Sequence, residues 1–494
     1  MRNLKIGQLA QWIDGKVYGN QQRLFSGLAR IDSRQVQEGD LFFAFSGKNT
    51  DGHKYVPQVL AKAVAAVVVQ EFDEQWLDWL QPEQAIIVVH DVQKALQQGA
   101  RAYRQSRNVP VIAITGSTGK TSTKDLVATA LESTLDVMKS PGNFNNEIGL
   151  PLTLLSMQDH HQALVLEMGM RGRGQIEELC SIASPDIAVL TNIGPVHLEL
   201  LGSMEAIAEA KGELLRSLQP EGIAIVNGED ALAVQQAINS SCMCVFYGLD
   251  HNQLWKTLRE TGWPEDRPVE VIVADHIKAL GLEGSEVFYQ WLSYPRQEND
   301  KVPLQSACFR LSLPGKHQVA NALAALAVTK VLHLDTSMVA QAFLTAQLSS
   351  LRWETHRFPQ KITVINDAYN ANPTAMKAAL GTLSEIACQQ RKVAILGDMY
   401  ELGEMSSQFH QEVGKEVHRQ GYNLLIAIGS LGLHIAEGAL QAGMEKNKVY
   451  TYETRQEAAL SIVPMLQAED FVLIKASRGM GLEELVNVLV KALR

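Results

Sequence analysis

Short apolar runs separated by stretches of helical spacing fill the first part of the chain, from residue 4 to about residue 107. These apolar runs lie at residues 40–45, 65–69 and 85–89. Runs of this kind, bounded by polar segments, are typical of buried strands. The pattern predicts a small α/β domain, to which we assign residues 1–108.

Two further blocks repeat this alternation. We expect their strands at residues 109–114, 163–168, 187–191, 223–227, 362–366, 392–396, 424–428 and 471–474. An alanine-rich helix, expected from residue 319 to about residue 332, separates the blocks. Strands that alternate with helices predict largely parallel sheets covered by helices. We therefore expect an α/β protein of three domains, with a parallel sheet in residues 109–354 and a Rossmann-like sheet in residues 355–494.

The stretch from residue 248 to residue 305 shows neither the spacing of a helix nor that of a buried strand clearly. It is more polar and contains Pro264, Pro268, Pro295 and Pro303. Prolines usually mark breaks in regular structure. We expect an elaboration of the second domain here, and the pattern leaves its position open.

The charge balance limits the possible partners. The chain of 494 residues contains 44 Lys and Arg against 54 Asp and Glu, a net charge of −10. Because non-specific binding to nucleic acid needs a positive surface, we expect no nucleic-acid partner. Five scattered cysteines argue against a disulfide framework, and Cys242 and Cys244 are interpreted as ordinary thiols rather than a metal pair. With no signal peptide and no long apolar run, we expect a cytoplasmic protein without membrane insertion. We also expect a monomer.

A phosphate-binding loop is predicted directly after the strand at residues 109–114. The segment Thr115-Gly116-Ser117-Thr118-Gly119-Lys120-Thr121 contains glycines that let backbone N–H groups surround an anion, and a helical pattern follows it. In such loops the lysine reaches the outer phosphates and the final hydroxyl binds Mg²⁺. Ile114 stands where the general motif has its first glycine, so the loop is a variant. We predict nucleotide binding, with a simple turn as the alternative.

Three other residues are candidates for the accompanying chemistry. Glu167 ends a predicted strand, where acidic residues of such sheets face the ligand crevice, although acids at strand ends are also often helix caps. His197 follows another predicted strand, and a lone histidine is more often structural. Lys211 by itself is typical of a solvated helix lysine. A Mg²⁺ ion at Thr121 would require further oxygen ligands, which makes Glu167 the natural candidate.

Taken together, these segments resemble the muramyl ligase family, the ATP-dependent amide-forming enzymes of peptidoglycan synthesis. The resemblance covers nearly the whole chain, and the segments around Ser33 and Asp51 are similar to the family's uridine-nucleotide substrate domain. It implies that ATP binds the loop at residues 115–121. It also implies that Lys211 is carbamylated. The catalytic residues that the resemblance implies are Lys120, Glu167, His197 and Lys211. The resemblance also implies about two Mg²⁺ ions, and the implied metal ligands are Thr121, Glu167, His197 and Lys211.

The resemblance also implies contacts with the substrates. The implied ATP contacts beyond the loop are Asn321, Arg357 and Asp367. The implied contacts with the other substrates are Ser33, Arg34, Asn143, Asn145, Asn146, Tyr369, Asn370, Asn372 and Arg478. The chain departs from the family pattern at Gln318, where asparagine is usual, and at His356 and Ala476, where glycine is usual.

The stretch Tyr369-Asn370-Ala371-Asn372-Pro373 is similar to the family member that adds a dipeptide. The resemblance therefore implies that a UDP-N-acetylmuramoyl-tripeptide is activated as an acyl phosphate and joined to D-alanyl-D-alanine. Two alternatives remain at this point. One is a ligase similar to folylpolyglutamate synthetase, and the other is a nucleotide-dependent switch protein without ligase activity.

Overall fold

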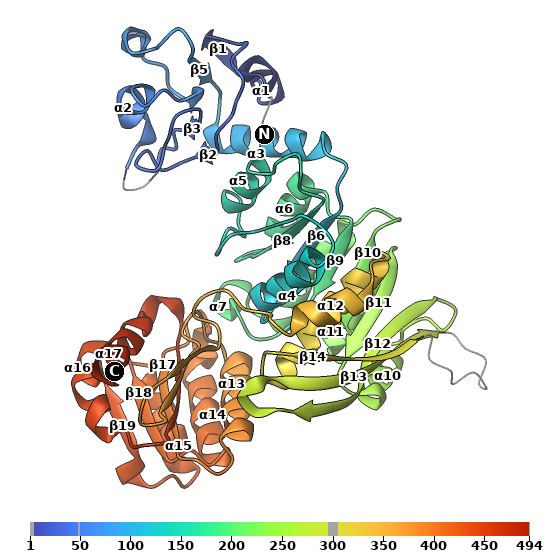
Figure 1. Ribbon diagram of the computed structural model, residues 1–494, viewed down its shortest axis with the longest axis vertical. Coiled ribbons are helices and arrows are strands. Elements are labelled where there is room, and N and C mark those ends of the chain that lie inside the picture. The colour runs from blue at the N-terminus through green and yellow to red at the C-terminus, as the bar shows by residue number, and fades with distance from the viewer. Residues whose placement is uncertain (1–3, 48–49, 295–304, 494) are drawn as a thin grey trace.

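The computed structural model describes residues 4–47, 50–294 and 305–493. It contains three sheets, each with its own helices, which follow one another along the long axis of the molecule (Figure 1). The N-terminal sheet lies at one end and the C-terminal sheet at the other. The expected three-domain α/β fold is therefore confirmed, while the boundaries at residues 108 and 354 stay predictions. Pro295 and Pro303 lie outside the described residues.

The N-terminal sheet has the strand order β1-β5-β4-β3-β2, and its strands are parallel except for β1. The predicted strands appear as β3, β4 and β5. The elements are α1 (Ile6–Trp12), β1 (Lys16–Gly19), β2 (Ala29–Arg30), β3 (Leu41–Phe43), α2 (Val56–Leu60), β4 (Ala66–Val69), β5 (Ala85–Val88) and α3 (Val92–Gln105).

Helix α3 joins this domain to the next one. Its N-cap Asp91 accepts a hydrogen bond from the backbone N–H of Lys94 at 2.9 Å, which fixes where the helix begins. The buried side chains of Leu96, Ala100 and Tyr103 belong to a core shared by the N-terminal and central domains. This continuous core ties the N-terminal domain to the central one.

The central sheet has the order β14-β13-β12-β11-β10-β9-β6-β8-β7. Its elements are β6 (Val111–Thr115), α4 (Lys120–Glu132), β7 (Val137–Lys139), α5 (Gly149–Leu155), β8 (Ala163–Glu167), α6 (Gln175–Ala183), β9 (Ile187–Leu190), α7 (Leu198–Leu201), α8 (Met204–Arg216), β10 (Ile223–Asn227), α9 (Ala231–Ile238), β11 (Met243–Gly248), α10 (His251–Glu260), β12 (Val269–Ala279), β13 (Ser285–Tyr294), β14 (Gln305–Leu311), α11 (Lys316–Val331) and α12 (Thr336–Phe343). Helices α4, α11 and α12 cover one face, and α5, α6, α8, α9 and α10 cover the other. The predicted alanine-rich helix is α11.

The central sheet is parallel from β7 to β12 and antiparallel at β13 and β14. The described part of the stretch 248–305 therefore extends the sheet, which the sequence pattern left open. The connection between β12 and β13 is short and contains Gly284 at φ +98°. A parallel neighbour would need a long crossover, so this short connection forces an antiparallel pair.

The C-terminal sheet has the order β15-β16-β20-β17-β18-β19, and it is parallel except for β15. The predicted strands of this block appear as β16, β17, β18 and β20. The elements are β15 (Glu354–Arg357), β16 (Thr363–Asn366), α13 (Pro373–Ile386), β17 (Lys392–Gly397), α14 (Ser406–Arg419), β18 (Leu424–Ile428), α15 (Gly432–Gln441), β19 (Val449–Tyr452), α16 (Arg455–Ile462), β20 (Phe471–Lys475) and α17 (Glu483–Leu493).

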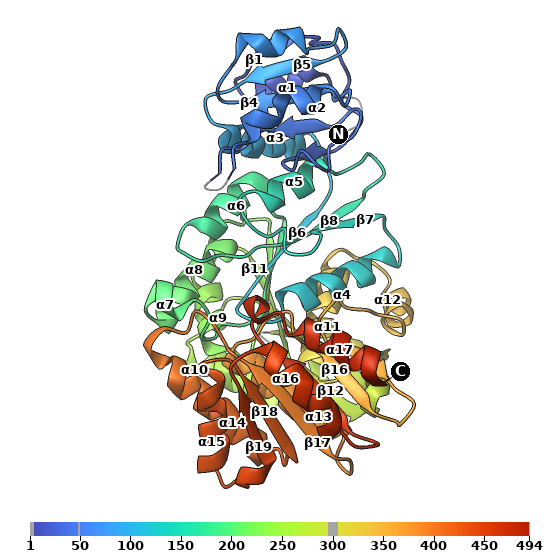
Figure 2. The same ribbon diagram turned by 90° about the vertical axis from the view of Figure 1, so that its left-hand side faces the viewer.

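The order of the central strands locates a crevice. Strand β6 lies between β8 and β9, so the chain leaves β6 toward one side of the sheet and later returns on the other. Ligands of open α/β sheets bind at the carboxyl ends of strands at such a point. In Figure 2 helix α7, which follows β9, lies directly above the C-terminal domain, in agreement with its packing against the 3₁₀ turn η4 (Gly403–Met405). None of the described helices is long and apolar enough to cross a membrane.

Candidate active site

The loop between β6 and α4 has a backbone that requires glycine. Gly116 has φ +149°, and a Cβ there would lie 1.9 Å from Thr191 Oγ1. Gly119 has φ +79° and immediately precedes the first residue of α4. Side chains are strained or excluded at both positions, so glycine allows the tight turn that leads into the N-terminus of α4.

The segment after β9 holds this loop in place. The backbone N–H of Thr118 donates to Asn192 Oδ1 at 2.9 Å. The Ser117 hydroxyl donates to the carbonyl oxygen of Gly194 at 3.0 Å. These bonds fix the loop on the strand beside β6, which is the preorganisation that an anion site needs.

Two lysines meet at one carbonyl group of the loop. Lys120 Nζ donates to the Gly116 carbonyl oxygen at 2.8 Å, and Lys211 Nζ donates to the same oxygen at 3.0 Å. Burial lowers the pKa of Lys211 well below its usual value, and the neighbouring Lys120 lowers it further. Desolvation also lowers the pKa of Lys120, against the opposing effect of Glu167. Lys211 is 1% exposed, so the interpretation of a solvated helix lysine is wrong.

Glu167 is the last residue of β8, as predicted, and its carboxylate faces the loop. Thr121 Oγ1 donates to Glu167 Oε2 at 2.7 Å, and Asn145 Nδ2 donates to Oε1 at 2.8 Å. Three predicted site residues from separate segments therefore form one cluster. The alternative role of Glu167 as a helix cap is not what the structure shows.

His197 begins α7 with φ +55° and contacts the C-terminal domain. Its Nδ1 forms a short hydrogen bond with Glu401 Oε2. Burial lowers the pKa of His197, Glu401 raises it, and the nearby Lys211 and Lys120 lower it. His197 therefore lies within the electrostatic reach of both Lys120 and Lys211.

Arg352 also lies at the loop, although it was not among the predicted site residues. Its Nη2 donates to Thr121 Oγ1 at 2.8 Å, and its guanidinium carbon lies 4.3 Å from the ring centre of Tyr369. The preceding residue, Leu351, has φ +64°, a conformation that favours glycine. The family's arginine usually follows a glycine, so this backbone feature points to Arg352. The predicted Arg357 is 63% exposed and lies 3.8 Å from Glu283.

A second polar cluster lies at the carboxyl ends of β16 and β20. Lys475 Nζ donates to Asp367 Oδ2 at 2.5 Å and to the Asn370 carbonyl oxygen at 3.0 Å. Desolvation lowers the pKa of the neighbouring His317 to about 4, so its imidazole is neutral near pH 7. The predicted residues Asp367 and Asn370 are thus held by Lys475, which was not among the predicted site residues.

Asn321 packs against α4. Its Oδ1 accepts a hydrogen bond from Thr123 Oγ1 at 3.1 Å, and its Nδ2 donates to Gln318 Oε1 at 3.1 Å. A Cβ on Gly119 would lie 3.1 Å from Asn321 Oδ1. The side chain therefore borders the phosphate loop, and Gln318, which replaces the usual asparagine, supports it from within α11.

The other predicted residues do not join the loop cluster. Asn146 caps the start of α5 by accepting from Gly149 N at 2.8 Å, and Asn372 caps α13 by accepting from Ala375 N at 2.9 Å. Asn143 is exposed. The remaining three make local contacts elsewhere: the Ser33 carbonyl accepts from Lys62, Arg34 pairs with Asp32, and Arg478 pairs with Glu483.

The donor set fits one Mg²⁺ ion in part. Thr121 Oγ1 and Glu167 supply hard oxygens, which Mg²⁺ prefers, beside a phosphate loop. The described residues contain no cluster of three His, Cys, Asp or Glu side chains suited to a metal, so phosphate oxygens would have to complete the shell. An ammonium at Lys211 does not fit a cation site, whereas a carbamate would.

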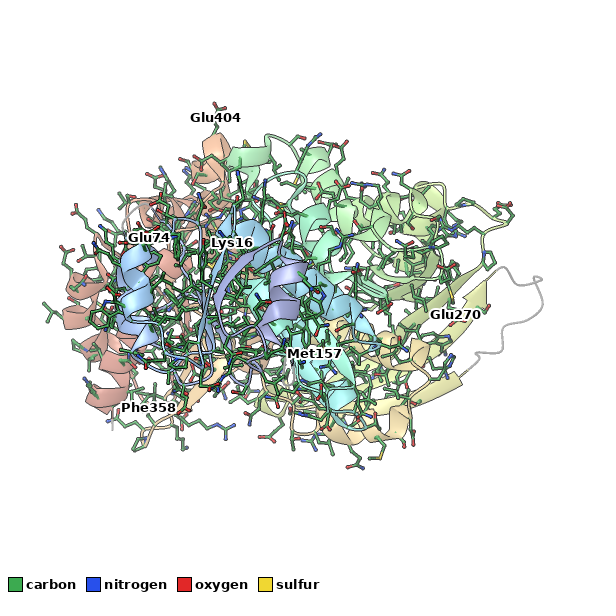
Figure 3. All side chains as sticks on the ribbon, turned by 90° about the horizontal axis from the view of Figure 1, so that it is seen from above. Lys16, Glu74, Met157, Glu270, Phe358 and Glu404 are labelled. Carbon is green, nitrogen blue, oxygen red and sulfur yellow. The ribbon has the colours of Figure 1, made fainter. Side chains whose placement is uncertain are left out.

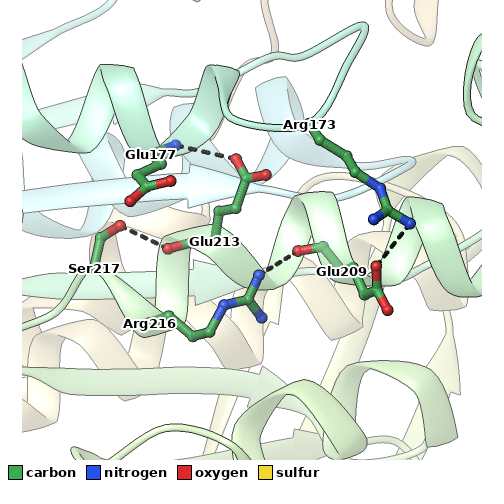
Figure 4. Close-up of a pocket in the computed structure, with 6 residues that line it drawn as sticks. All are labelled: Arg173, Glu177, Glu209, Glu213, Arg216 and Ser217. Carbon is green, nitrogen blue, oxygen red and sulfur yellow. Dashed lines mark hydrogen bonds and ion pairs between the residues drawn. The ribbon is translucent and has the colours of Figure 1, made fainter.

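A cavity of about 430 Å³ lies between α8 and the start of α6, and none of its lining residues belongs to the phosphate loop (Figure 4). Several of its charged groups have partners: Arg173 pairs with Glu209 at 2.8 Å, and Glu213 accepts from the backbone N–H groups of Gly174 and Glu177. Glu213 thereby joins α8 to the start of α6. The cavity is part of the scaffold of α8 rather than of the site.

Comparisons with known proteins agree along the whole chain. Three family descriptions match it in order: the Mur ligase family catalytic domain at residues 28–104, the Mur ligase middle domain at 114–329, and the Mur ligase glutamate ligase domain at 351–478. The UDP-N-acetylmuramoyl-tripeptide–D-alanyl-D-alanine ligase of Bacillus subtilis (strain 168) is 35% identical, over 99% of this chain and 98% of its own length.

Solved structures give the same picture. The crystal structure of MurF from Acinetobacter baumannii has a TM-score of 0.82 and 28% identity, with 99% of both chains covered. MurF ligase from Thermotoga maritima in complex with ADP has a TM-score of 0.76 and 25% identity, covering 95% of this chain and 98% of that one.

Proposed function

The chain belongs to the Mur ligase family, and we propose that it joins D-alanyl-D-alanine to a UDP-N-acetylmuramoyl-tripeptide in an ATP-dependent, ADP-forming reaction. The observation that carries this proposal is full-length similarity to a relative of that name. The match at residues 28–104 argues against the folylpolyglutamate alternative, because that segment is expected to be the uridine-nucleotide domain. We also propose a monomer located in the cytoplasm.

ATP is proposed to bind between the central and C-terminal domains. The loop at residues 115–121 would receive the β- and γ-phosphates, with Lys120 balancing their charge. Asn321 borders the loop and is assigned to the nucleotide from the resemblance. Arg352 replaces Arg357 in our assignment, because its guanidinium already lies at the Thr121 hydroxyl. Asp367 is assigned to the nucleotide from the opposite domain.

The implied metal would be held mainly by Thr121 and Glu167. Bound Mg²⁺ would supply positive charge for the transferring phosphoryl group. His197 and Lys211 are proposed as ligands of a second ion, provided that Lys211 carries a carbamate. Carbamylation consumes the neutral amine, and the lowered pKa of Lys211 favours that form.

The reaction proceeds in two substitutions. An oxygen of the tripeptide carboxylate attacks the γ-phosphorus, the bond from phosphorus to the β-γ bridging oxygen breaks, and ADP leaves. The amine of D-alanyl-D-alanine then attacks the acyl carbon, loses a proton and expels phosphate. Because the enzyme holds the acceptor and ATP in line, much of the barrier is removed by positioning. Exclusion of water protects the acyl phosphate from hydrolysis.

The predicted substrate contacts are distributed over all three domains. Ser33 and Arg34 are proposed to contact the uridine nucleotide, and the segment 143–146 the peptide. The stretch Tyr369–Pro373 and Arg478 are proposed to contact the dipeptide. Asn145 also orients Glu167 through its 2.8 Å hydrogen bond, so the peptide segment and the metal ligand would move together.

Phosphate release tests this function. We expect it to require ATP, UDP-N-acetylmuramoyl-tripeptide and D-alanyl-D-alanine together, and to stop when any one is omitted. Free D-alanine, D-glutamate or diaminopimelate should support it poorly. A preference for a single amino acid would assign the chain to a different reaction in the family, and nucleotide hydrolysis without an amine would favour the switch protein.

A further inference from the structure

The loop that follows β17, residues 398–405, reaches from the C-terminal domain to the central one. Glu401 in this loop accepts from His197 through one carboxylate oxygen, and Arg171 Nε lies 4.0 Å from the other. His197 and Glu401 both have positive φ, 55° and 63°. Non-glycine residues keep such a conformation where the surrounding structure fixes it. The two side chains are therefore held toward each other across the domain boundary.

The backbones of the same two loops also approach closely. The N–H of Glu199 points to the carbonyl oxygen of Glu401 at 3.5 Å. A Cβ on Gly403 would lie 3.3 Å from Glu199 Cα, so a larger residue there would press on the central domain. The two loops therefore pack closely against each other around the His197–Glu401 hydrogen bond.

We propose that Glu401 is a positioning residue that orients His197 through Nδ1 and makes this orientation depend on docking of the C-terminal domain. The inference rests on the proposed function, in which His197 serves the reaction through its other ring nitrogen. A histidine that binds a metal usually donates its second N–H to a carboxylate, which fixes the tautomer and the ring plane. Here the carboxylate belongs to another domain. His197 is therefore correctly placed when the domains are in contact and free to turn when they separate.

The test compares Glu401→Gln and Glu401→Ala with the matched control Glu404→Gln. Glu404 lies three residues later in the same loop and projects from the margin of the molecule (Figure 3). The first measurement is hydrogen–deuterium exchange of residues 193–202 in the full-length protein without substrates. We expect faster exchange in Glu401→Ala, a smaller increase in Glu401→Gln, and wild-type exchange in the control.

The second measurement is steady-state kinetics. We expect kcat to fall by about 10–100-fold in Glu401→Gln, the usual cost of losing such a partner, with KM for D-alanyl-D-alanine unchanged. In a His197→Ala background the same substitution should have no further effect, because the ring it orients is gone. Additive losses in the double variant, or wild-type exchange and kcat in Glu401→Ala, would overturn the proposal. If the wild-type protein is not a ligase, the proposed function fails, and the exchange comparison still decides whether Glu401 holds His197.

Discussion

Two buried lysines of the central domain have opposite surroundings. Lys124 on α4 is 1% exposed, lies 3.3 Å from Asp125 Oδ1 and donates to the Ser140 carbonyl oxygen at 3.0 Å. Lys211 on α8 is also 1% exposed, but it shares one carbonyl oxygen with Lys120, and no carboxylate of the described residues forms an ion pair with it. Lys124 therefore has a compensating carboxylate, whereas Lys211 lies beside a second lysine.

The difference distinguishes a structural lysine, Lys124, from a lysine of the candidate active site, Lys211. Desolvation of a charged group costs several kcal/mol unless a partner compensates it, and Asp125 provides that compensation for Lys124. Among the residues that the structure describes, no carboxylate plays this part for an unmodified Lys211 ammonium. Groups with strongly shifted pKa values and such neighbours are concentrated at functional sites. The geometry therefore marks Lys211 as the residue whose charge must change for the site to work.

The largest expected effect is that of Lys211→Ala on ligation. If a carbamate at Lys211 helps to hold the reacting groups, its loss should lower kcat by about 10²–10³, as for other preorganised electrostatic contacts. Phosphate release under saturating substrates measures this. A small carboxylic acid such as formate should partly restore the rate by occupying the vacated position, whereas Lys124→Met should show no such rescue. Full activity in Lys211→Ala would remove Lys211 from the mechanism.

A second comparison concerns the two arginines near the domain boundary. Arg352→Ala should raise the KM for ATP by roughly 10–100-fold, the range expected for losing a charge-assisted hydrogen bond. Arg357→Ala should change it by less than about twofold, as is usual for an exposed side chain. Equal effects of the two substitutions would show that the contact between Arg352 and Thr121 does not identify the nucleotide arginine.

A third difference concerns stability, and its sign separates the two lysines. In protein freed of CO₂, Lys211→Met should raise the free energy of unfolding by about 1–4 kcal/mol, because the wild-type fold buries a lysine that no carboxylate of the described residues compensates. Lys124→Met should lower it by about 3–5 kcal/mol, because Asp125 loses its partner. Denaturant unfolding at neutral pH measures both changes.

The pH dependence of this effect follows from the lowered pKa of Lys211. Above that pKa the folded state binds fewer protons than the unfolded state, so wild-type stability rises with pH until the ordinary lysine pKa is reached. The advantage of Lys211→Met should therefore shrink as the pH rises. An advantage that is constant with pH would contradict the lowered pKa of Lys211.

Sequence patterns predicted most of the fold because buried strands such as β6 and β17 are continuous apolar runs. They missed β15 and β1, edge strands of mixed exposure, and the hairpin of β12 and β13, whose register depends on tertiary pairing. The loop, Glu167 and His197 were found from their places after strands. The burial of Lys211 was not predicted, because a helix pattern does not show that a facing loop covers the lysine. Arg352 was missed because the residue before it is a leucine, and the sequence does not show that Leu351 adopts a backbone conformation typical of glycine.

In the proposed reaction ATP activates the tripeptide carboxylate as an acyl phosphate, and the fate of the carboxylate oxygens distinguishes this route from others. UDP-N-acetylmuramoyl-tripeptide labelled with ¹⁸O in its acceptor carboxylate is incubated with ATP and D-alanyl-D-alanine, and the released phosphate is analysed by mass spectrometry. Because the attacking carboxylate oxygen stays on phosphorus when the amine displaces phosphate, we predict one ¹⁸O atom in each phosphate formed from fully labelled substrate. Phosphate that contains no ¹⁸O, while the amide product forms, would contradict the account.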